Sequence, residues 1–187
     1  MKIVVFRKNA IIAAVLLVAV TLAAVVFSGS IVESAMSTTA ASRSLPIYSV
    51  QRNDKKASIS FDAAWGNEDT QQIIDILAQY DVKATFFVVG EWVDKYPESV
   101  KALHDAGHEV MNHSDTHPYM TKLSASEMLS QVNGCSDKIE KVTGVRPHLF
   151  RPPYGDYNDT VIDTLLDNGY YTAWIGKTFP PRRSLHE

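Results

Sequence analysis

The chain has 187 residues, which is enough for one ordinary domain and too few for two. Hydrophobic residues make up 45% of it and charged residues 21%, a balance that excludes a disordered or collagen-like chain. The formal net charge is -3, so no nucleic-acid partner is expected. The single cysteine, Cys135, rules out an internal disulfide framework and a cysteine-based zinc site.

The first thirty residues have the pattern of a signal peptide or a membrane anchor. Three basic residues precede an apolar run at residues 10–27. The run is longer than the apolar region of a typical cleaved signal, about 7–15 residues, and lies at the short end of the roughly 17–25 residues of a spanning helix. The segment could be cleaved as a signal peptide or retained as a membrane anchor, whereas its all-round hydrophobicity disfavours a buried core helix. In both favoured cases a linker at residues 31–45 and a domain at residues 46–187 lie outside the cytoplasmic membrane, in the cell envelope.

Strand-like and helix-like segments alternate along the rest of the chain. The stretch 57–61 is short and β-prone, and the helix expected next at 67–80 has Asn67 as a candidate cap. The nearly continuous apolar run at 83–89 is typical of a strand buried on both faces. The remaining predicted elements are helices at 97–106, 124–142 and 158–168 and strands at 108–112, 148–150 and 170–175; Ser124 and Glu127 form the capping-box start of the longest helix, and Gly144 ends it.

This alternation predicts a parallel sheet with helical crossovers, either open or closed into a barrel. In both forms, functional side chains gather at the carboxyl ends of the strands. Asp62 comes directly after the first strand, where a carboxylate can serve as a general base or a metal ligand, or can simply form a turn or cap the next helix. Two further polar clusters at strand ends lie at residues 113–117 and 151–155.

The cluster at residues 113–117 contains two histidines, His113 and His117, four positions apart. In a helical turn they would face the same side and could bind one metal ion through imidazole nitrogens, although a polar loop with two solvated histidines has the same pattern. The cluster at residues 151–155 has two prolines that stiffen the backbone. Such a loop can hold a backbone N–H toward a reacting carbonyl, and Arg151 can pair with a buried carboxylate; a stiff connector with a surface arginine is the alternative.

Three sequence blocks occur in this order: Phe61-Asp62, His113-Ser114-x-x-His117 and Arg151-Pro152-Pro153-Tyr154-Gly155. Their order and spacing resemble those of the polysaccharide deacetylases, the NodB-homology domains of carbohydrate esterase family 4. The resemblance covers residues 45–173 and includes the apolar strand with its closing glycine at 83–90. The pattern F-D-x-x-W-G at residues 61–66 resembles the sporulation-associated subgroup of Gram-positive spore formers.

The resemblance implies an α/β fold, a distorted (β/α) barrel of the NodB-homology type. It implies hydrolysis of acetamido groups on N-acetylglucosamine-containing polysaccharides such as peptidoglycan or chitin. Carried over to this chain, His113 and His117 would bind a divalent metal, usually zinc, and Asp62 would be the general base that activates the metal-bound water. The backbone N–H of Tyr154 would stabilise the oxyanion, and Arg151 would orient Asp62. The N-terminal segment would add the membrane as a partner.

The chain departs from the family pattern at two places. The family's first motif has two adjacent aspartates, the second a metal ligand, but Ala63 follows Asp62 here; Glu68, Asp69 or Asp62 itself could take that role. Beyond the strand that corresponds to residues 170–175 of this chain, members of the family continue into an Asp/Trp motif and a final strand ending in Leu-x-His. The C-terminal residues do not match these motifs, and His186 lacks a preceding strand pattern, so it is given no role as general acid. We therefore expect a truncated or frameshifted product whose barrel is incomplete at the C-terminus, with unpaired strand edges, reduced stability and little or no catalysis.

Two function classes remain open for such a chain. One is a metal-dependent deacetylase of the cell envelope, and the other is a non-catalytic, membrane-tethered glycan-binding or degenerate protein. Aromatic side chains could stack on sugar rings in either class, although most aromatic residues of such a chain belong to the core. The candidates for stacking are Trp65, Trp92, Tyr119, Tyr154 and Trp174.

Overall fold

The computed structural model describes residues 16–22, 43–51, 53–54 and 56–174, and the chain divides into two units, Met1–Arg43 and Ser44–Glu187. In the first unit, residues 16–22 are helical. Among the described residues, no helix combines the length and the hydrophobicity that crossing a membrane requires. Most of the predicted signal or anchor segment, and the C-terminal residues from 175 onward, lie outside the described residues.

The second unit is built on a sheet of five parallel strands that lie in their order along the chain. Because each strand pairs with the next one along the chain, and crossovers between parallel strands are almost always right-handed, the connecting helices all fall on one face of the sheet. Sequential parallel strands with an outer layer of helices form the wall of a (β/α) barrel. The α/β fold expected from the sequence is therefore confirmed. The strands are β1 (Ser60–Ala63), β2 (Thr85–Val88), β3 (Glu109–Asn112), β4 (Leu149–Phe150) and β5 (Tyr171–Thr172).

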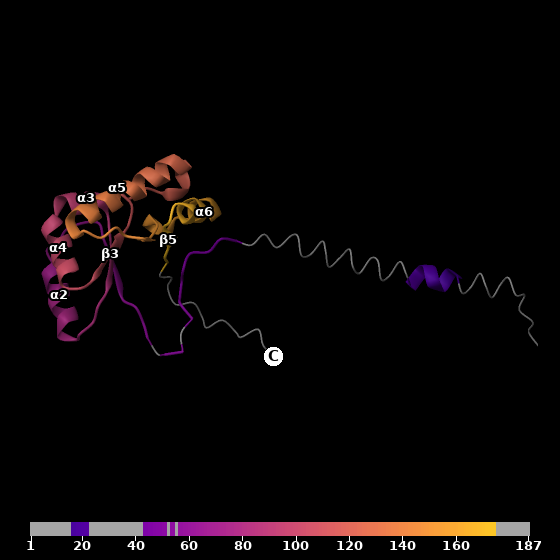
Figure 1. The fold of residues 1–187 in the computed structure, drawn as a ribbon, viewed down its shortest axis with the longest axis horizontal. Coiled ribbons are helices and arrows are strands. Elements are labelled where there is room, and N and C mark those ends of the chain that lie inside the picture. Colours follow the sequence, from indigo (N-terminus) through magenta and orange to yellow (C-terminus); the bar gives the residue numbers. More distant parts are fainter. Residues whose placement is uncertain (1–15, 23–42, 52, 55, 175–187) are drawn as a thin grey trace, which may run out of the picture. The chain divides into compact units, whose positions relative to one another are not determined.

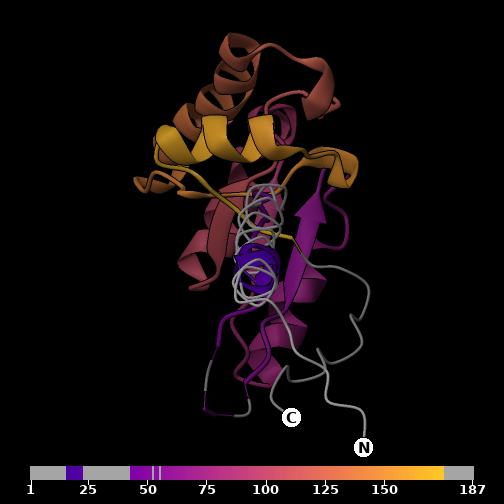
Figure 2. The ribbon, with the colours of Figure 1, turned by 90° about the vertical axis from the view of Figure 1, so that its right-hand side faces the viewer.

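Five helices of the second unit cover the sheet (Figure 1), and α5 and α6 lie against each other (Figure 2). The start of α5 has the predicted capping box, in which the Ser124 hydroxyl accepts from the Glu127 N–H and the Glu127 carboxylate accepts from the Ser124 N–H. Gly144 ends this helix in the left-handed conformation. The helices are α2 (Thr70–Gln79), α3 (Gly90–Lys95), α4 (Pro97–Asp105), α5 (Ala125–Thr143) and α6 (Asp159–Asp167), with short 3-10 turns η1 (Met120–Lys122) and η2 (Pro153–Gly155).

Two details at the helix starts differ from the sequence-based expectation. Asn67 does not cap α2, which begins after Asp69. Helix α3 follows β2 directly and was not predicted, because Gly90 was expected only to close the strand. The N–H groups of Gly90 and Glu91 donate to the carbonyls of Ser114 and Asp115, so the first turn of α3 is stabilised by a loop that is distant in sequence.

The core lies in two hydrophobic clusters, one between the sheet and helices α2–α5 and one around α5, α6 and β4. Along β1 the side chains alternate, so Phe61 and Ala63 pack toward the first cluster while Ser60 and Asp62 face the opposite side of the sheet. Cys135 is buried in the first cluster, and this burial raises the pKa of its thiol to about 12, which makes it a packing residue. The opposite side of the sheet is thereby left for the polar residues of the strand ends.

The outer edge of β5 is partly covered by the segment that precedes β1. The Ile47 N–H donates to the Thr172 carbonyl at 2.8 Å, and the Trp174 N–H donates to the Ile47 carbonyl at 2.9 Å. The hydroxyls of Tyr48 and Tyr157 are hydrogen-bonded beside this pairing. One edge that an incomplete barrel was expected to leave unpaired therefore has a partner, and the same hydrogen bonds fix the position of Trp174.

Candidate active site

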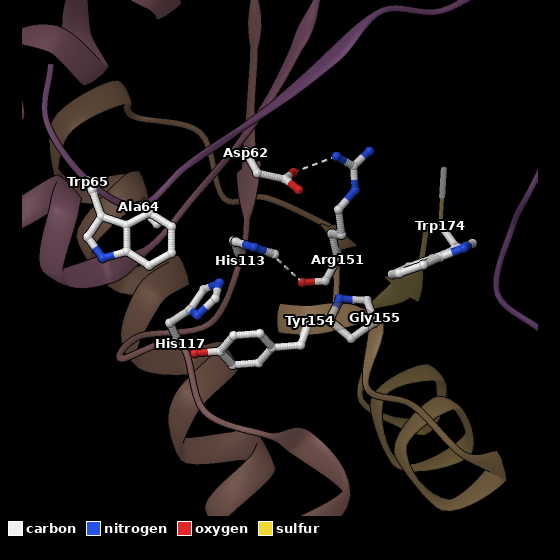
Figure 3. Close-up of a pocket in the computed structure, with 10 residues that line it drawn as sticks. Asp62, Ala64, Trp65, His113, His117, Arg151, Tyr154, Gly155 and Trp174 are labelled. Atoms are coloured by element: carbon white, nitrogen blue, oxygen red, sulfur yellow. Dashed lines mark hydrogen bonds and ion pairs between the residues drawn. The ribbon is translucent and has the colours of Figure 1, made fainter. Parts of the chain in front are cut away.

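An open pocket of about 280 Å³ lies at the carboxyl ends of β1, β3 and β4 (Figure 3). All five residues singled out by the motifs line it, and they come from three segments that are far apart in the sequence. Parallel strands bring their carboxyl ends to the same edge of a sheet, which is why these segments meet. The lining residues are Asp62, Ala64, Trp65, His113, His117, Arg151, Pro152, Tyr154, Gly155 and Trp174.

Asp62 and Arg151 form an ion pair in the lining of the pocket. Arg151 Nη1 donates to Asp62 Oδ1 at 2.5 Å, Nη2 donates to the Ser60 hydroxyl at 2.7 Å, and the guanidinium lies 3.9 Å from the centroid of the Phe87 ring. The arginine side chain is 8% exposed, whereas that of Asp62 is 45% exposed. A buried and triply held cation thus fixes the orientation of a carboxylate that still reaches the open pocket. Ser60 was not predicted to have a role, although its position two residues before Asp62 places it on the same face of β1.

His113 is oriented by the backbone of the third motif. Its Nδ1 lies 2.7 Å from the Arg151 carbonyl, so Nδ1 carries the proton and Nε2 is left for a ligand. Burial lowers the pKa of His113, although the Asp62 charge and the hydrogen bond to Arg151 act in the opposite direction. The neutral imidazole is the form that binds metals.

His117 lies beside His113, but not through a helical turn. The segment between them is irregular, and both Ser114 and His117 adopt positive φ, 69° and 60°. The expected helical turn is therefore wrong, and a left-handed loop brings the two imidazole centroids to 4.9 Å instead. Burial lowers the pKa of His117 as well, and its Nδ1 is buried with no hydrogen-bond partner among the described residues.

The residues of the pocket fit a divalent metal held by two histidines. Each imidazole offers a ring nitrogen that is free of protein hydrogen bonds in the described part of the chain, and the Asp62 charge acts on both rings. Residues 16–22, 43–51, 53–54 and 56–174 contain no cluster of three or more His, Cys, Asp or Glu that could hold a metal, so these described residues add no clear third protein ligand to the two histidines. Asp62 is thus the carboxylate that shares the pocket with both histidines.

The acidic residues suggested as replacements for the family's second aspartate lie elsewhere. Glu68 accepts a hydrogen bond from the Asn67 N–H at 3.0 Å, and Asp69 precedes the first turn of α2. Neither Glu68 nor Asp69 lines the pocket. Of the two alanines that follow Asp62, Ala64 lines the pocket and Ala63 does not.

Aromatic side chains form a row beside the pocket. Tyr119 and Tyr154 stack with centroids 4.3 Å apart, Tyr154 meets His117 edge-on at 4.6 Å, and Trp65 lies 5.5 Å from His117 on the other side. Trp65 is 81% exposed, and both tyrosines are more than half exposed. Trp92, by contrast, is buried and donates to the Gly66 carbonyl, so it belongs to the core. Exposed rings beside a pocket offer flat apolar faces to a ligand.

The sequence of this chain is similar to those of known polysaccharide deacetylases. The family described as polysaccharide deacetylase matches residues 49–173. The chain is 46% identical over 110 residues to the peptidoglycan-N-acetylmuramic acid deacetylase PdaC of Bacillus subtilis, covering 59% of this chain and 24% of that protein. It is 35% identical over 109 residues to a peptidoglycan-N-acetylglucosamine deacetylase of Bacillus cereus, covering 58% and 40%. The chain spans between 24% and 48% of the length of the first three curated relatives.

Solved structures show the same relationship. A wild-type CE4 family pseudoenzyme from Bacillus anthracis superposes with a TM-score of 0.66 at 39% identity, covering 69% of this chain and 46% of that chain. The peptidoglycan deacetylase PdaC from Bacillus subtilis superposes with a TM-score of 0.60 at 42% identity, covering 67% and 60%. With a family match over most of its second unit and relatives of the same fold, the chain belongs to the polysaccharide deacetylase family.

Proposed function

We propose that this chain is a metal-dependent hydrolase that removes acetyl groups from N-acetylated amino sugars of peptidoglycan, outside the cytoplasmic membrane. The observation that carries the proposal is that one pocket brings together the two histidines, the Asp62–Arg151 ion pair and the Tyr154 loop. Relatives named as peptidoglycan deacetylases support the substrate class and the extracytoplasmic location. The basic and apolar N-terminus supports export or anchoring.

The residues of the pocket divide the reaction between them. His113 and His117 would hold the metal, and a bound divalent metal such as zinc lowers the pKa of water and polarises a carbonyl. Asp62, held by Arg151, would accept the proton of the attacking water and then carry the proton that the departing amine requires. The backbone N–H of Tyr154 would donate to the oxyanion that develops on the acetamide carbonyl oxygen when water attacks the carbon. The exposed rings of Trp65 and Tyr119 would stack on sugars of the glycan chain.

A second candidate function is glycan binding without catalysis. Ala63 in place of the family's second aspartate leaves a two-histidine site, and a relative 39% identical to this chain is described as a pseudoenzyme. A variant of that relative, 40% identical to this chain, is described as having restored enzymatic activity. Because His113, His117 and Asp62 still share one pocket although Ala63 stands where the family has its second aspartate, we expect slow turnover rather than none.

Release of acetate from peptidoglycan by the purified full chain tests the proposal. We expect slow release that zinc supports, that His113→Ala abolishes and that His148→Ala, a change at an exposed histidine, leaves unchanged. Ala63→Asp introduces the second aspartate of the family motif, and Ala64→Asp introduces a carboxylate at the alanine that lines the pocket. At least one of the two should raise the rate of acetate release. Zinc-independent binding to peptidoglycan with no acetate release by any of the five proteins would favour the second candidate.

A further inference from the structure

The loop that joins His113 to His117 is held in a conformation that it would not adopt alone. Ser114 and His117 both have φ in the left-handed region, at 69° and 60°. Such conformations cost free energy for residues with a side chain, and they persist only where the surroundings impose them. Since His117 is one of the two histidines proposed to bind the metal, the contacts that impose this conformation also position the site.

Helix α5 presents one face to this loop. Gln131 and Lys138 are seven residues apart, two turns of helix, and therefore lie on the same side. The side-chain carbonyl of Gln131 accepts from the N–H of Asp115 at 3.1 Å, from the N–H of Thr116 at 2.9 Å and from the Thr116 hydroxyl at 3.3 Å. One acceptor thus holds two consecutive residues at the tip of the loop.

The neighbouring contacts fix the rest of the loop. Lys138 Nζ pairs with Asp115 at 2.6 Å and with Asp94 of α3 at 2.7 Å. The Asp115 carboxylate occupies the space that a Cβ at Gly90 would need, and the Asp115 carbonyl accepts from the Glu91 N–H. Asp115 is thereby held from both α3 and α5.

Strand β3 supplies the remaining contacts through Asn112. Its side-chain carbonyl accepts from the Ser114 N–H at 2.8 Å, and its amide donates to the Val132 carbonyl and the Ser136 hydroxyl on α5. The Ser114 hydroxyl accepts from the His117 N–H at 3.0 Å. A chain of hydrogen bonds therefore runs from α5 to the backbone of His117.

We propose that Gln131 is a positioning residue for the metal site: by accepting from residues 115 and 116 it keeps His117 in the left-handed conformation that faces His113. This inference rests on the proposed function, because the proposed function is what gives the loop a role in metal binding. Groups that orient metal ligands without touching the metal typically contribute about 10–100-fold to metal affinity. Gln131 is half-buried and is not among the buried residues of α5, so its replacement leaves the packed face of the helix intact.

Two substitutions of similar length separate this role from simple packing. Gln131→Met keeps the size of the side chain and removes the acceptor, whereas Gln131→Glu keeps an oxygen that can accept from the same N–H groups. Gln72→Met, at an exposed position on α2, is the matched control for introducing a methionine. If Gln131 only packed against the loop, Met and Glu would differ little.

The test uses the full-length chain and two measurements. In the metal-free protein, amide hydrogen exchange of Asp115 and Thr116 is followed by NMR; in the titration, zinc affinity is measured by calorimetry. We expect Gln131→Met to speed the exchange of these two amides by about fivefold or more and to weaken zinc binding by about 10–100-fold. Gln131→Glu and Gln72→Met should stay close to the wild type in both.

Wild-type exchange rates and zinc affinity in Gln131→Met would overturn the proposal. Equal losses in Gln131→Met and Gln131→Glu would also overturn it, because the acceptor would then not be the group that matters. If the wild-type chain bound no zinc, the proposed function would fail, and the exchange rates would still decide whether Gln131 holds the loop.

Discussion

Gly155 should tolerate no side chain, because two constraints meet at this residue in the wall of the pocket. Its φ is 69°, and an added Cβ would collide with the indole of Trp174. Gly144 offers the matched control, since its φ is 76° and nothing lies within 4 Å of an added Cβ. The left-handed backbone alone costs an L residue about 1–2 kcal/mol, which is the loss of unfolding free energy expected for Gly144→Ala. Gly155→Ala should lose about 1–3 kcal/mol more, because the collision overpacks the site.

Urea unfolding of the wild-type chain and the two variants, followed by tryptophan fluorescence, measures both effects. Gly155→Ala should also change the emission of the native protein, because Trp174 must move away from the Tyr154 loop. Equal losses of stability in the two variants, with an unchanged native spectrum in Gly155→Ala, would refute the inferred contact between Trp174 and the loop.

Three further predictions concern the pocket and the core. Ser60→Ala removes a hydrogen bond to the buried guanidinium of Arg151, so it should lower the unfolding free energy by roughly 1.5–3 kcal/mol in urea melts, and an unchanged melt would contradict this. Tyr119→Ala should weaken binding of N-acetylglucosamine oligomers by about fivefold in calorimetry, whereas Tyr80→Ala, at an exposed tyrosine next to α2, should not; equal effects would exclude stacking by Tyr119. Burial, and then the charge of Lys83, lower the pKa of His108, so the folded state binds its proton less readily than the unfolded state does. The stability that neutral His108 contributes should be fully present above about pH 6.5 and should fall as the pH drops below that value, and urea midpoints measured at several pH values should depend less on pH in His108→Asn.

Local sequence patterns predicted most of the elements, because their ends carry local signals. Helix α5 begins and ends within a residue of its prediction, since the capping box of Ser124 and Glu127 and the left-handed Gly144 act within a few residues. Helix α3 was missed for the opposite reason. Its first N–H groups are satisfied by carbonyls of residues 114 and 115, and its Trp92 and Val93 are buried by tertiary packing that no local pattern reveals.

The motifs also predicted which residues would share one pocket, because strand ends converge in any parallel sheet. The motifs did not predict how His117 reaches His113. The left-handed loop between them depends on Asn112 and on Gln131 of α5, a helix that comes later in the sequence. An asparagine at the end of a buried strand, directly before the first histidine, was the available signal. The location of Glu68 and Asp69 outside the pocket depends on where α2 begins, and this differed from the expected cap at Asn67.

Zinc titration of the metal-free full chain tests the central claim most directly. We expect about one zinc per chain, bound through imidazole nitrogens, with the site lost in His113→Ala and in His117→Ala and retained in His148→Ala, whose histidine is exposed and lies outside the pocket. A wild-type chain that binds no zinc, or binding that survives in both His113→Ala and His117→Ala, would contradict the assignment of this pocket as a metal-dependent deacetylase site.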